Sequence, residues 1–368
     1  MPPGSLSTLA VMKPGPRIAR NAISRNLTSE RLGLLRTNGR EVVTSPRIAY
    51  LLRVEGRAER KQVKNKLLKA VAVTELILGH AFCNIPLEFS VTEPVFESRM
   101  AEIDGTKLHY LTAGSGPPLL LLHGYAETSS MWRSFLPEVA ERFMVVAPDL
   151  PGIGDSDIPA EGLDMQSAAV RIHALARSLG IEKARVVGHD IGLMVAYAYA
   201  AQFPAEVEKL VVMDAFLPGV GEWEAIYNDP GYWHFRFNGA TPEALVRGRE
   251  RIYFEYLWND LAANKWRSIP EADREAYAEA YSGPGRMRAG WAYFVSFPQT
   301  AKDFAKLAET KLTMPVLAIG GDKSLGEFLG RQMKLAASDV TAVVVEGSGH
   351  WLLEEQPDQT ARALVAFL

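Results

Sequence analysis

The sequence predicts an α/β fold, in which a mostly parallel sheet is covered by helices on both faces. From residue 96 onward, short apolar runs alternate with stretches whose apolar residues recur every three or four positions. Such alternation is typical of strands followed by helices. The strand-like runs are rich in Val, Ile and Leu and are nearly all apolar, as parallel strands buried on both faces are. Between residues 216 and 298 these runs stop, which indicates a helical insertion.

Taken in order, the elements follow from these patterns. The expected strands of the body are Lys107–Thr112, Leu119–His123, Met144–Asp149, Ala184–Gly188, Lys209–Asp214, Val316–Gly320 and Val340–Glu346. The expected helices are Gln166–Leu179, Gly192–Ala201 and Gln356–Leu368 and, in the insertion, Pro242–Leu257 and Glu271–Tyr281. We expect the insertion to cover the edge of the sheet at which its strands end, because open parallel sheets place their binding sites there.

Composition excludes several classes of protein. The chain has 368 residues, of which 48% are hydrophobic and 23% charged, so it is neither a coiled coil nor wholly disordered. The single cysteine, Cys83, excludes an intramolecular disulfide and a cysteine-based metal cage. None of the seven histidines lies four positions from another, so we expect no His-rich metal site. The sequence implies neither a metal nor a cofactor. The absence of a long apolar run predicts no transmembrane segment.

Charge is distributed unevenly along the chain. Residues 1–95 carry 15 Lys and Arg against 7 Glu and no Asp, whereas the remaining residues carry 25 against 36 acids. We therefore expect residues 1–95 to be a basic, partly flexible extension of an acidic body. An acidic body argues against a nucleic-acid ligand.

The extension contains a basic stretch at 57–69, followed by an apolar stretch, Leu67–Phe82. A signal for targeting or secretion and a surface amphipathic helix both remain open for this segment. The expected location is cytoplasmic.

A short turn carries the strongest chemical signal. Gly188-His189-Asp190-Ile191-Gly192 follows an expected strand and precedes an expected helix. This is the pattern G-x-nucleophile-x-G, in which small residues flank a strained turn. Asp190 stands at the nucleophile position, and a carboxylate is already ionised at neutral pH. It can attack an electrophilic carbon and form an alkyl ester.

Several segments together resemble the α/β-hydrolase superfamily and, within it, the aspartate-nucleophile branch of epoxide hydrolases and haloalkane or fluoroacetate dehalogenases. The matching segments are Leu122–Tyr125, Asp149–Ser156, Gly188–Gly192 and Gly347–Trp351. The resemblance spans residues 96–368. It implies an eight-stranded sheet built from residues 96–215 and 299–368, with residues 216–298 as a helical lid.

The resemblance also implies a base and its acid. His350 follows the last expected strand, where the family keeps the histidine that activates water. Two carboxylates could orient it. Asp214 ends an earlier strand, and Asp322 follows the next one, two residues before the position at which many relatives place the acid. We favour Asp214 and keep Asp322 as the alternative.

The family holds the oxyanion of ester hydrolysis with two backbone N–H groups. Here they would belong to Tyr125, after His-Gly, and to Ile191, after the nucleophile. Lid side chains would donate hydrogen bonds to the oxygen of the opening ring, and the lid motifs single out His234 and Tyr277. Tyr281 is then a packing residue, and Met194, Phe235 and Phe237 would line the pocket.

These expectations point to an epoxide hydrolase that converts a small hydrophobic epoxide and water into a vicinal diol through an ester on Asp190. A haloalkane or haloacetate dehalogenase with the same nucleophile is the alternative. Fluoroacetate dehalogenases carry Arg at the positions of Ile191 and Met194, and both residues are apolar here. A receptor that binds without catalysis is a third hypothesis. The oligomeric state stays open, a homodimer included.

Overall fold

The computed structural model describes residues 33–37, 40–44, 96–266 and 268–368. The chain divides into two compact units, Met1–Glu93 and Pro94–Leu368. In the first unit, β1 (Gly33–Thr37) pairs antiparallel with β2 (Arg40–Thr44). The predicted targeting or amphipathic segment at 57–82 lies outside the described residues, as does most of the expected extension.

The second unit is built on an eight-stranded sheet with the order β10-β9-β8-β7-β5-β6-β4-β3. Its strands are β3 (Glu97–Ile103), β4 (Thr106–Ala113), β5 (Pro118–Leu122), β6 (Met144–Pro148), β7 (Ala184–His189), β8 (Val207–Met213), β9 (Val316–Gly321) and β10 (Val340–Val345). The pairs β3–β4 and β4–β6 are antiparallel, and the other pairs are parallel. The predicted mostly parallel sheet of an α/β hydrolase is therefore confirmed.

The edge strand β3 was not among the expected strands. Its side chains are mostly exposed, and it carries Glu97, Arg99 and Glu102. Edge strands face water and are often charged, so β3 shows no continuous apolar run. The inner strands β5 and β7 are almost wholly buried, which is why their runs are easy to recognise.

Helices pack on this sheet much as their periodicity predicts. The helices of the body are α4 (Leu136–Val139), α5 (Met165–Ser178), α6 (Ile191–Gln202), α13 (Phe328–Ala336), α14 (Leu352–Glu355) and α15 (Pro357–Phe367), with short 3-10 helices η1 (Ser129–Ser134) and η2 (Pro204–Glu206). Helix α6 packs against α5 and against β7 and β8, while α13 packs on β9 and β10. Because α6 lies between other elements, every residue from Ile191 to Ala200 is buried.

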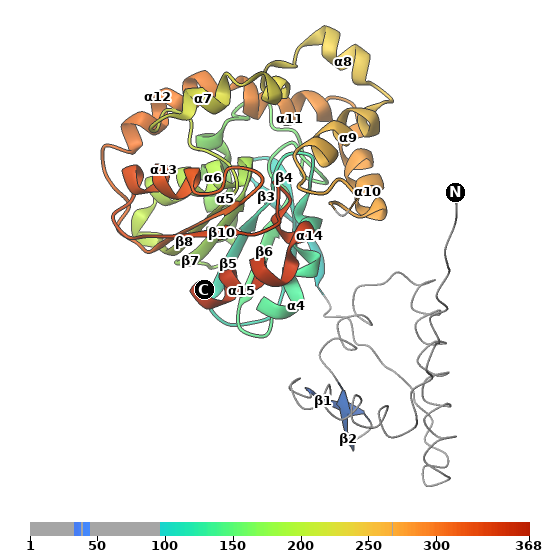
Figure 1. Ribbon diagram of the computed structural model, residues 1–368, viewed down its shortest axis with the longest axis vertical. Coiled ribbons are helices and arrows are strands. Elements are labelled where there is room, and N and C mark those ends of the chain that lie inside the picture. The colour runs from blue at the N-terminus through green and yellow to red at the C-terminus, as the bar shows by residue number, and fades with distance from the viewer. Residues whose placement is uncertain (1–32, 38–39, 45–95, 267) are drawn as a thin grey trace, which may run out of the picture. The chain divides into compact units, whose positions relative to one another are not determined.

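Between β8 and β9, the named elements of the described residues are all helices. This stretch contains α7 (Trp223–Tyr227), η3 (Pro230–Arg236), α8 (Ala240–Val246), α9 (Glu250–Asp260), α10 (Glu271–Ser282), α11 (Arg286–Val295) and α12 (Phe297–Leu307). Figure 1 shows these helices, in yellow and orange, gathered on one side of the sheet. We call α7 to α11 with η3 the lid helices.

One lid helix differs from its expected extent. The sequence predicts a helix over Pro242–Leu257, but the chain breaks into α8 and α9 there. Gly248 lies in the break with a φ of +72°, a conformation that a helix interior does not allow. Across all described ranges, no helix combines the length and apolarity that a membrane span requires.

Candidate active site

Asp190 sits at a sharp turn between β7 and α6. Its φ of 52° and ψ of −124° are strained for a residue with a side chain. The tight fit of the two flanking glycines explains their presence. A methyl group on Gly188 would collide with the carbonyl of Gly192, and one on Gly192 would collide with the carbonyl of Leu122. The turn thus holds the Asp190 side chain at the carboxyl end of the sheet.

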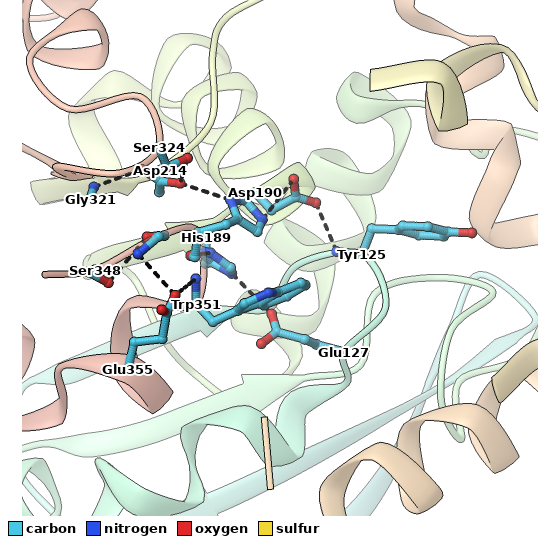
Figure 2. A network of polar contacts seen from close by, with 12 residues as sticks. Tyr125, Glu127, His189, Asp190, Asp214, Gly321, Ser324, Ser348, Trp351 and Glu355 are labelled. Atoms are coloured by element: carbon cyan, nitrogen blue, oxygen red, sulfur yellow. Dashed lines mark hydrogen bonds and ion pairs between the residues drawn. The ribbon is translucent and has the colours of Figure 1, made fainter. Parts of the chain in front are cut away.

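His350 lies between two carboxylates. Its Nδ1 is 2.9 Å from Oδ2 of Asp214, and its Nε2 is 3.5 Å from Oδ2 of Asp190. Asp214 is itself fixed, because it accepts hydrogen bonds from the Gly321 N–H (2.9 Å) and the Ser324 hydroxyl (2.7 Å). Figure 2 shows Ser324 next to Asp214, with Gly321 on one side of Asp214 and Asp190 on the other. The arrangement is that of a nucleophile, a base and an orienting acid.

Of the two carboxylates considered for this orienting role, the structure brings only Asp214 to His350. Asp322 instead accepts the N–H of Ser348 at 3.1 Å and pairs with the ammonium of Lys323 at 2.8 Å. Ser324, the position at which many relatives place the acid, donates its hydroxyl to Asp214. The chain after β8 therefore supplies the carboxylate, Asp214, and the chain after β9 supplies a hydrogen-bond donor to it, Ser324.

The charge on His350 depends on its two neighbours. Burial lowers the pKa of this imidazole, but the hydrogen bond that His350 donates to Asp214 and the charges of Asp190 and Asp214 outweigh burial and raise the pKa to about 9. While both carboxylates are ionised, the imidazole therefore carries a proton at neutral pH. Loss of the negative charge on Asp190 removes one of the causes that raise this pKa.

The backbone of Tyr125 reaches the nucleophile. Its N–H donates to Oδ1 of Asp190 at 2.9 Å, and Figure 2 shows the main chain of Tyr125 directed at that carboxylate. The N–H of Ile191 is the first of helix α6, where backbone donors lack partners inside the helix. One oxygen of Asp190 is thus held by a backbone donor, while the other faces His350.

A buried pair joins the two loops that carry these groups. Nδ1 of His189 lies 3.0 Å from Oε2 of Glu127, and Nε2 of His189 lies 3.0 Å from the backbone oxygen of His350. The charge of Glu127 and its hydrogen bond oppose burial and raise the pKa of His189. Sequence reasoning did not single out Glu127 as functional, because its contact with His189 spans 62 positions.

The lid and the sheet form a cavity above Asp190 and His350, with about 430 Å³ of empty space that includes its opening to solvent. Its apolar walls comprise Met194, Ala215, Phe216, Ile226, Phe235, Leu261, Phe294, Phe297 and Leu325. Its polar lining, within the part of the chain that the structure describes, comprises Asp190, Asp214, Tyr232, His234, Ser324 and His350. No Lys or Arg stands among these lining residues.

His234 reaches the cavity from η3 of the lid. It is only 4% exposed, and its Nδ1 has no hydrogen-bond partner in the described structure. Burial lowers the pKa of this imidazole to about 4, so the ring is neutral at neutral pH. A neutral imidazole in an apolar cavity can donate one hydrogen bond to a bound ligand.

A possible cation-binding group lies elsewhere. Among the described residues, His109, Asp149 and Asp155 place ligand-type atoms close to one another. Oxygen Oδ2 of Asp149 already lies 2.8 Å from Nδ1 of His109 and accepts the Asp155 N–H at 2.9 Å. These hydrogen bonds explain why the three residues lie close together, since they stabilise the loop after β6.

Comparison with known proteins agrees with this geometry. A family model described as the alpha/beta hydrolase fold matches residues 117–357. The chain belongs to the α/β-hydrolase family. A soluble epoxide hydrolase of Corynebacterium sp. (strain C12) is 36% identical to this hydrolase over 266 residues, which cover 70% of this chain and 92% of the relative. This similarity places the hydrolase among the epoxide-hydrolase-like members.

Two further relatives are named for two different activities. The solved structure of the epoxide hydrolase CorEH without ligand has a TM-score of 0.69 and 32% identity, covering 74% of this chain and 98% of that one. A fluoroacetate dehalogenase of Burkholderia sp. is 28% identical over 292 residues, which cover 74% of this hydrolase and 94% of the relative. Both activities therefore occur among proteins similar to this one.

Two residues expected at the pocket are not among those that line it. Tyr277 is 1% exposed and packs near Trp258 in the lid, away from the cavity. Phe237 stacks on Tyr253 instead, with 5.8 Å between ring centroids. The cavity lining therefore differs from the expectation at both positions. A motif does not determine which side chains of the lid face the sheet, because packing among the aromatic residues decides it.

Tyr232 was missed by sequence reasoning. It lines the cavity from the same short helix as His234, and its ring stacks on Phe235 at 5.5 Å. Burial raises its pKa further above the neutral range, and nearby Asp214 adds to this effect, so the phenol keeps its proton. The signal was present in the sequence, since Tyr232 lies two positions before His234.

Proposed function

We propose that this hydrolase opens a small hydrophobic epoxide to a vicinal diol through a covalent alkyl ester on Asp190. Residues 216–298 act as the lid over a core formed by residues 96–215 and 299–368. The observation that carries the proposal is the position of Asp190, which has Oδ1 on a backbone N–H and Oδ2 at 3.5 Å from Nε2 of His350, at the floor of an apolar cavity. The comparison with epoxide hydrolases supports the substrate class.

In the first step Oδ2 of Asp190 attacks one ring carbon. The carbon–oxygen bond of the ring breaks, and its electron pair passes to the ring oxygen, which must then be protonated. His234 and Tyr232 are the lid side chains that can donate hydrogen bonds to this oxygen. We assign them as the donor pair. Tyr277 is left out because it does not reach the cavity.

In the second step the ester is hydrolysed. Tyr232 gives its phenol proton to the ring oxygen in the first step. Formation of the ester removes the negative charge of Asp190, which lowers the pKa of His350, and the proton that His350 releases replaces the one that Tyr232 gave up. The neutral imidazole, oriented by Asp214, then takes a proton from water, and the hydroxide attacks the ester carbonyl. The N–H groups of Tyr125 and Ile191 stabilise the oxyanion, and the diol leaves with the former Oδ2.

The electrostatics of the cavity favour a neutral substrate over a haloacetate. A substrate carboxylate would enter an apolar site that already holds the charges of Asp190 and Asp214. No Lys or Arg among the described lining residues would compensate it. Burying an unpaired charge is costly. The haloacetate form of the dehalogenase alternative therefore has a related sequence in its favour, but no Lys or Arg of the described lining would pair with its anionic substrate.

The test is a single turnover in heavy-oxygen water with excess enzyme and styrene oxide as the probe. The mechanism predicts that the new oxygen enters the peptide containing Asp190, because water attacks the ester carbonyl. The diol of that first turnover should then contain no heavy oxygen. Label in the diol alone would mean direct attack of water and would overturn the ester mechanism. Halide release from fluoroacetate or a bromoalkane without epoxide turnover would support the dehalogenase alternative.

A further inference from the structure

The lid helices do more than cover the cavity, because they bond to the loop that carries the oxyanion donor. We call Gly124–Glu127 the oxyanion loop. The indole N–H of Trp258 on α9 donates to the backbone oxygen of Ala126 at 3.1 Å. The hydroxyl of Tyr281 on α10 donates to the backbone oxygen of Glu127 at 3.2 Å. Both donors are buried, at 0% and 1% exposure.

The aromatic ring in this loop is also held by the lid. The ring of Tyr125 makes edge-to-face contacts with Phe254 of α9, Tyr281 of α10 and Phe294 of α11, with centroid distances of 5.6, 5.6 and 4.7 Å. Gly290 on α11 makes this approach possible. A methyl group there would lie 2.9 Å from the ring of Tyr281 and 3.0 Å from that of Tyr125.

On its other side the oxyanion loop contacts the catalytic groups. Tyr125 donates its N–H to Oδ1 of Asp190 at 2.9 Å, and Glu127 contacts His189 at 3.0 Å. A shift of this loop by a few tenths of an ångström would therefore change the position of the N–H that must stabilise the oxyanion. The lid and the nucleophile are connected through four residues of backbone.

This loop needs support from outside. Ala126 has a φ of +61°, a conformation that costs an alanine of the order of 1 kcal/mol. The carbonyls of Ala126 and Glu127 point into the protein, where an unpaired polar group is unfavourable. Trp258 and Tyr281 satisfy these two carbonyls while the loop has this strained shape.

We propose that Trp258 and Tyr281 are positioning residues, which hold the oxyanion loop in its strained form so that the Tyr125 N–H points at Asp190. This inference rests on the proposed function, since it assigns the two lid donors to the ester-hydrolysis step. Negative charge builds up on Oδ1 only in that step, so a misplaced N–H should slow ester breakdown more than ester formation.

The experiment compares Tyr281→Phe with Tyr293→Phe. Tyr293 is a matched control, because it is 0% exposed and its hydroxyl also donates from the lid to a backbone oxygen, that of Pro151, at 3.0 Å. Both variants lose one buried hydroxyl bond, but only Tyr281 bonds to the oxyanion loop. Rapid-quench single turnovers with styrene oxide give the rates of ester formation and ester breakdown separately.

We expect Tyr281→Phe to slow ester breakdown about fivefold or more, as the loss of one hydrogen bond implies, with a smaller change in ester formation. Tyr293→Phe should leave both rates close to those of the wild type. Trp258→Phe, which also changes volume, should act in the same direction as Tyr281→Phe. Equal rates of breakdown in the Tyr281→Phe and Tyr293→Phe variants would overturn the inference.

A second measurement does not depend on the chemistry. Hydrogen exchange of the Tyr125 amide should be faster in Tyr281→Phe than in the wild type and unchanged in Tyr293→Phe. If the wild type forms no ester, the proposed function fails. The exchange rates would still show whether the lid holds the loop. Thermal unfolding of both variants confirms that they are compared as folded proteins.

Discussion

The charge of Asp190 helps to set the charge of His350. Their side chains are 3.5 Å apart, and the carboxylate is one of the causes that raise the pKa of the imidazole to about 9. In the free enzyme the protonated His350 and the ionised Asp190 stabilise each other. In the proposed mechanism the imidazole acts as a base only after Asp190 has lost its charge, so the coupling of the two groups would set the order of the two steps.

Replacing the nucleophile tests this coupling directly. Asp190→Asn removes the charge but keeps the shape, so we expect the pKa of His350 to fall below about 9 and turnover to be lost. Nuclear magnetic resonance titration of the imidazole gives the pKa. Asp322→Asn is the control, because Asp322 bonds to Ser348 and Lys323 rather than to His350. An unchanged pKa in Asp190→Asn would contradict the coupling.

The donor pair can be tested at the same scale. Tyr232→Phe removes a phenol that lines the cavity, and we expect ester formation to slow by about 10²-fold, a typical contribution of a positioned proton donor. Tyr277→Phe is the control, because it removes a phenol outside the cavity, and it should leave the rate of ester formation unchanged. Rapid-quench measurement of the ester distinguishes them. A large effect of Tyr277→Phe with none of Tyr232→Phe would reverse our assignment.

Individual side chains also show how far sequence reasoning reaches. Asp190 and His350 could be identified because each stands in a short motif whose residues are neighbours along the chain. The choice between Asp214 and Asp322 depended on which strand end faces the His350 loop, and only the sheet order brings Asp214 within 2.9 Å. Tyr277 was misplaced, and Tyr232 was overlooked, because lid side chains contact one another across long sequence separations.

At the scale of the elements, the turn between β7 and α6 has no space for a side chain at Gly188 or Gly192. We expect Gly192→Ala to lose activity and to lower the free energy of unfolding by about 1–3 kcal/mol or more, because the added methyl collides with the carbonyls of Leu122 and His123. Helix α6 would have to move, and Asp190 with it. Activity and urea unfolding report the two effects.

Gly180→Ala is the matched control for this turn. Gly180 has a φ of +76° but no neighbouring atom within 4 Å of an added methyl, so the substitution costs only backbone strain, about 1 kcal/mol, and activity should be retained. If Gly192→Ala were as active and as stable as Gly180→Ala, the explanation that the nucleophile turn needs glycines because of close packing would be wrong.

The molecule as a whole should respond to pH through His350. Its folded-state pKa of about 9 lies above the ordinary value of 6.5, so its stabilising contribution is complete below pH 6.5 and is lost as the pH rises toward 9. We expect His350→Gln to reduce the loss of stability between these pH values. Urea unfolding of both proteins across this range measures the difference, which isolates His350 from the other histidines. Parallel curves would contradict this expectation.

The sequence alone determined the fold class and singled out Asp190 and His350 as the candidate nucleophile and base. Apolar runs alternating with helical periods encode a buried parallel sheet, and the nucleophile turn and the His350 loop are local motifs whose geometry is set by adjacent residues. Tertiary structure alone decided which carboxylate orients His350, which lid tyrosine faces the cavity, and which lid donors hold the loop that carries Tyr125. These contacts join residues more than a hundred positions apart, and packing of whole helices against the sheet, rather than any local preference, brings them together.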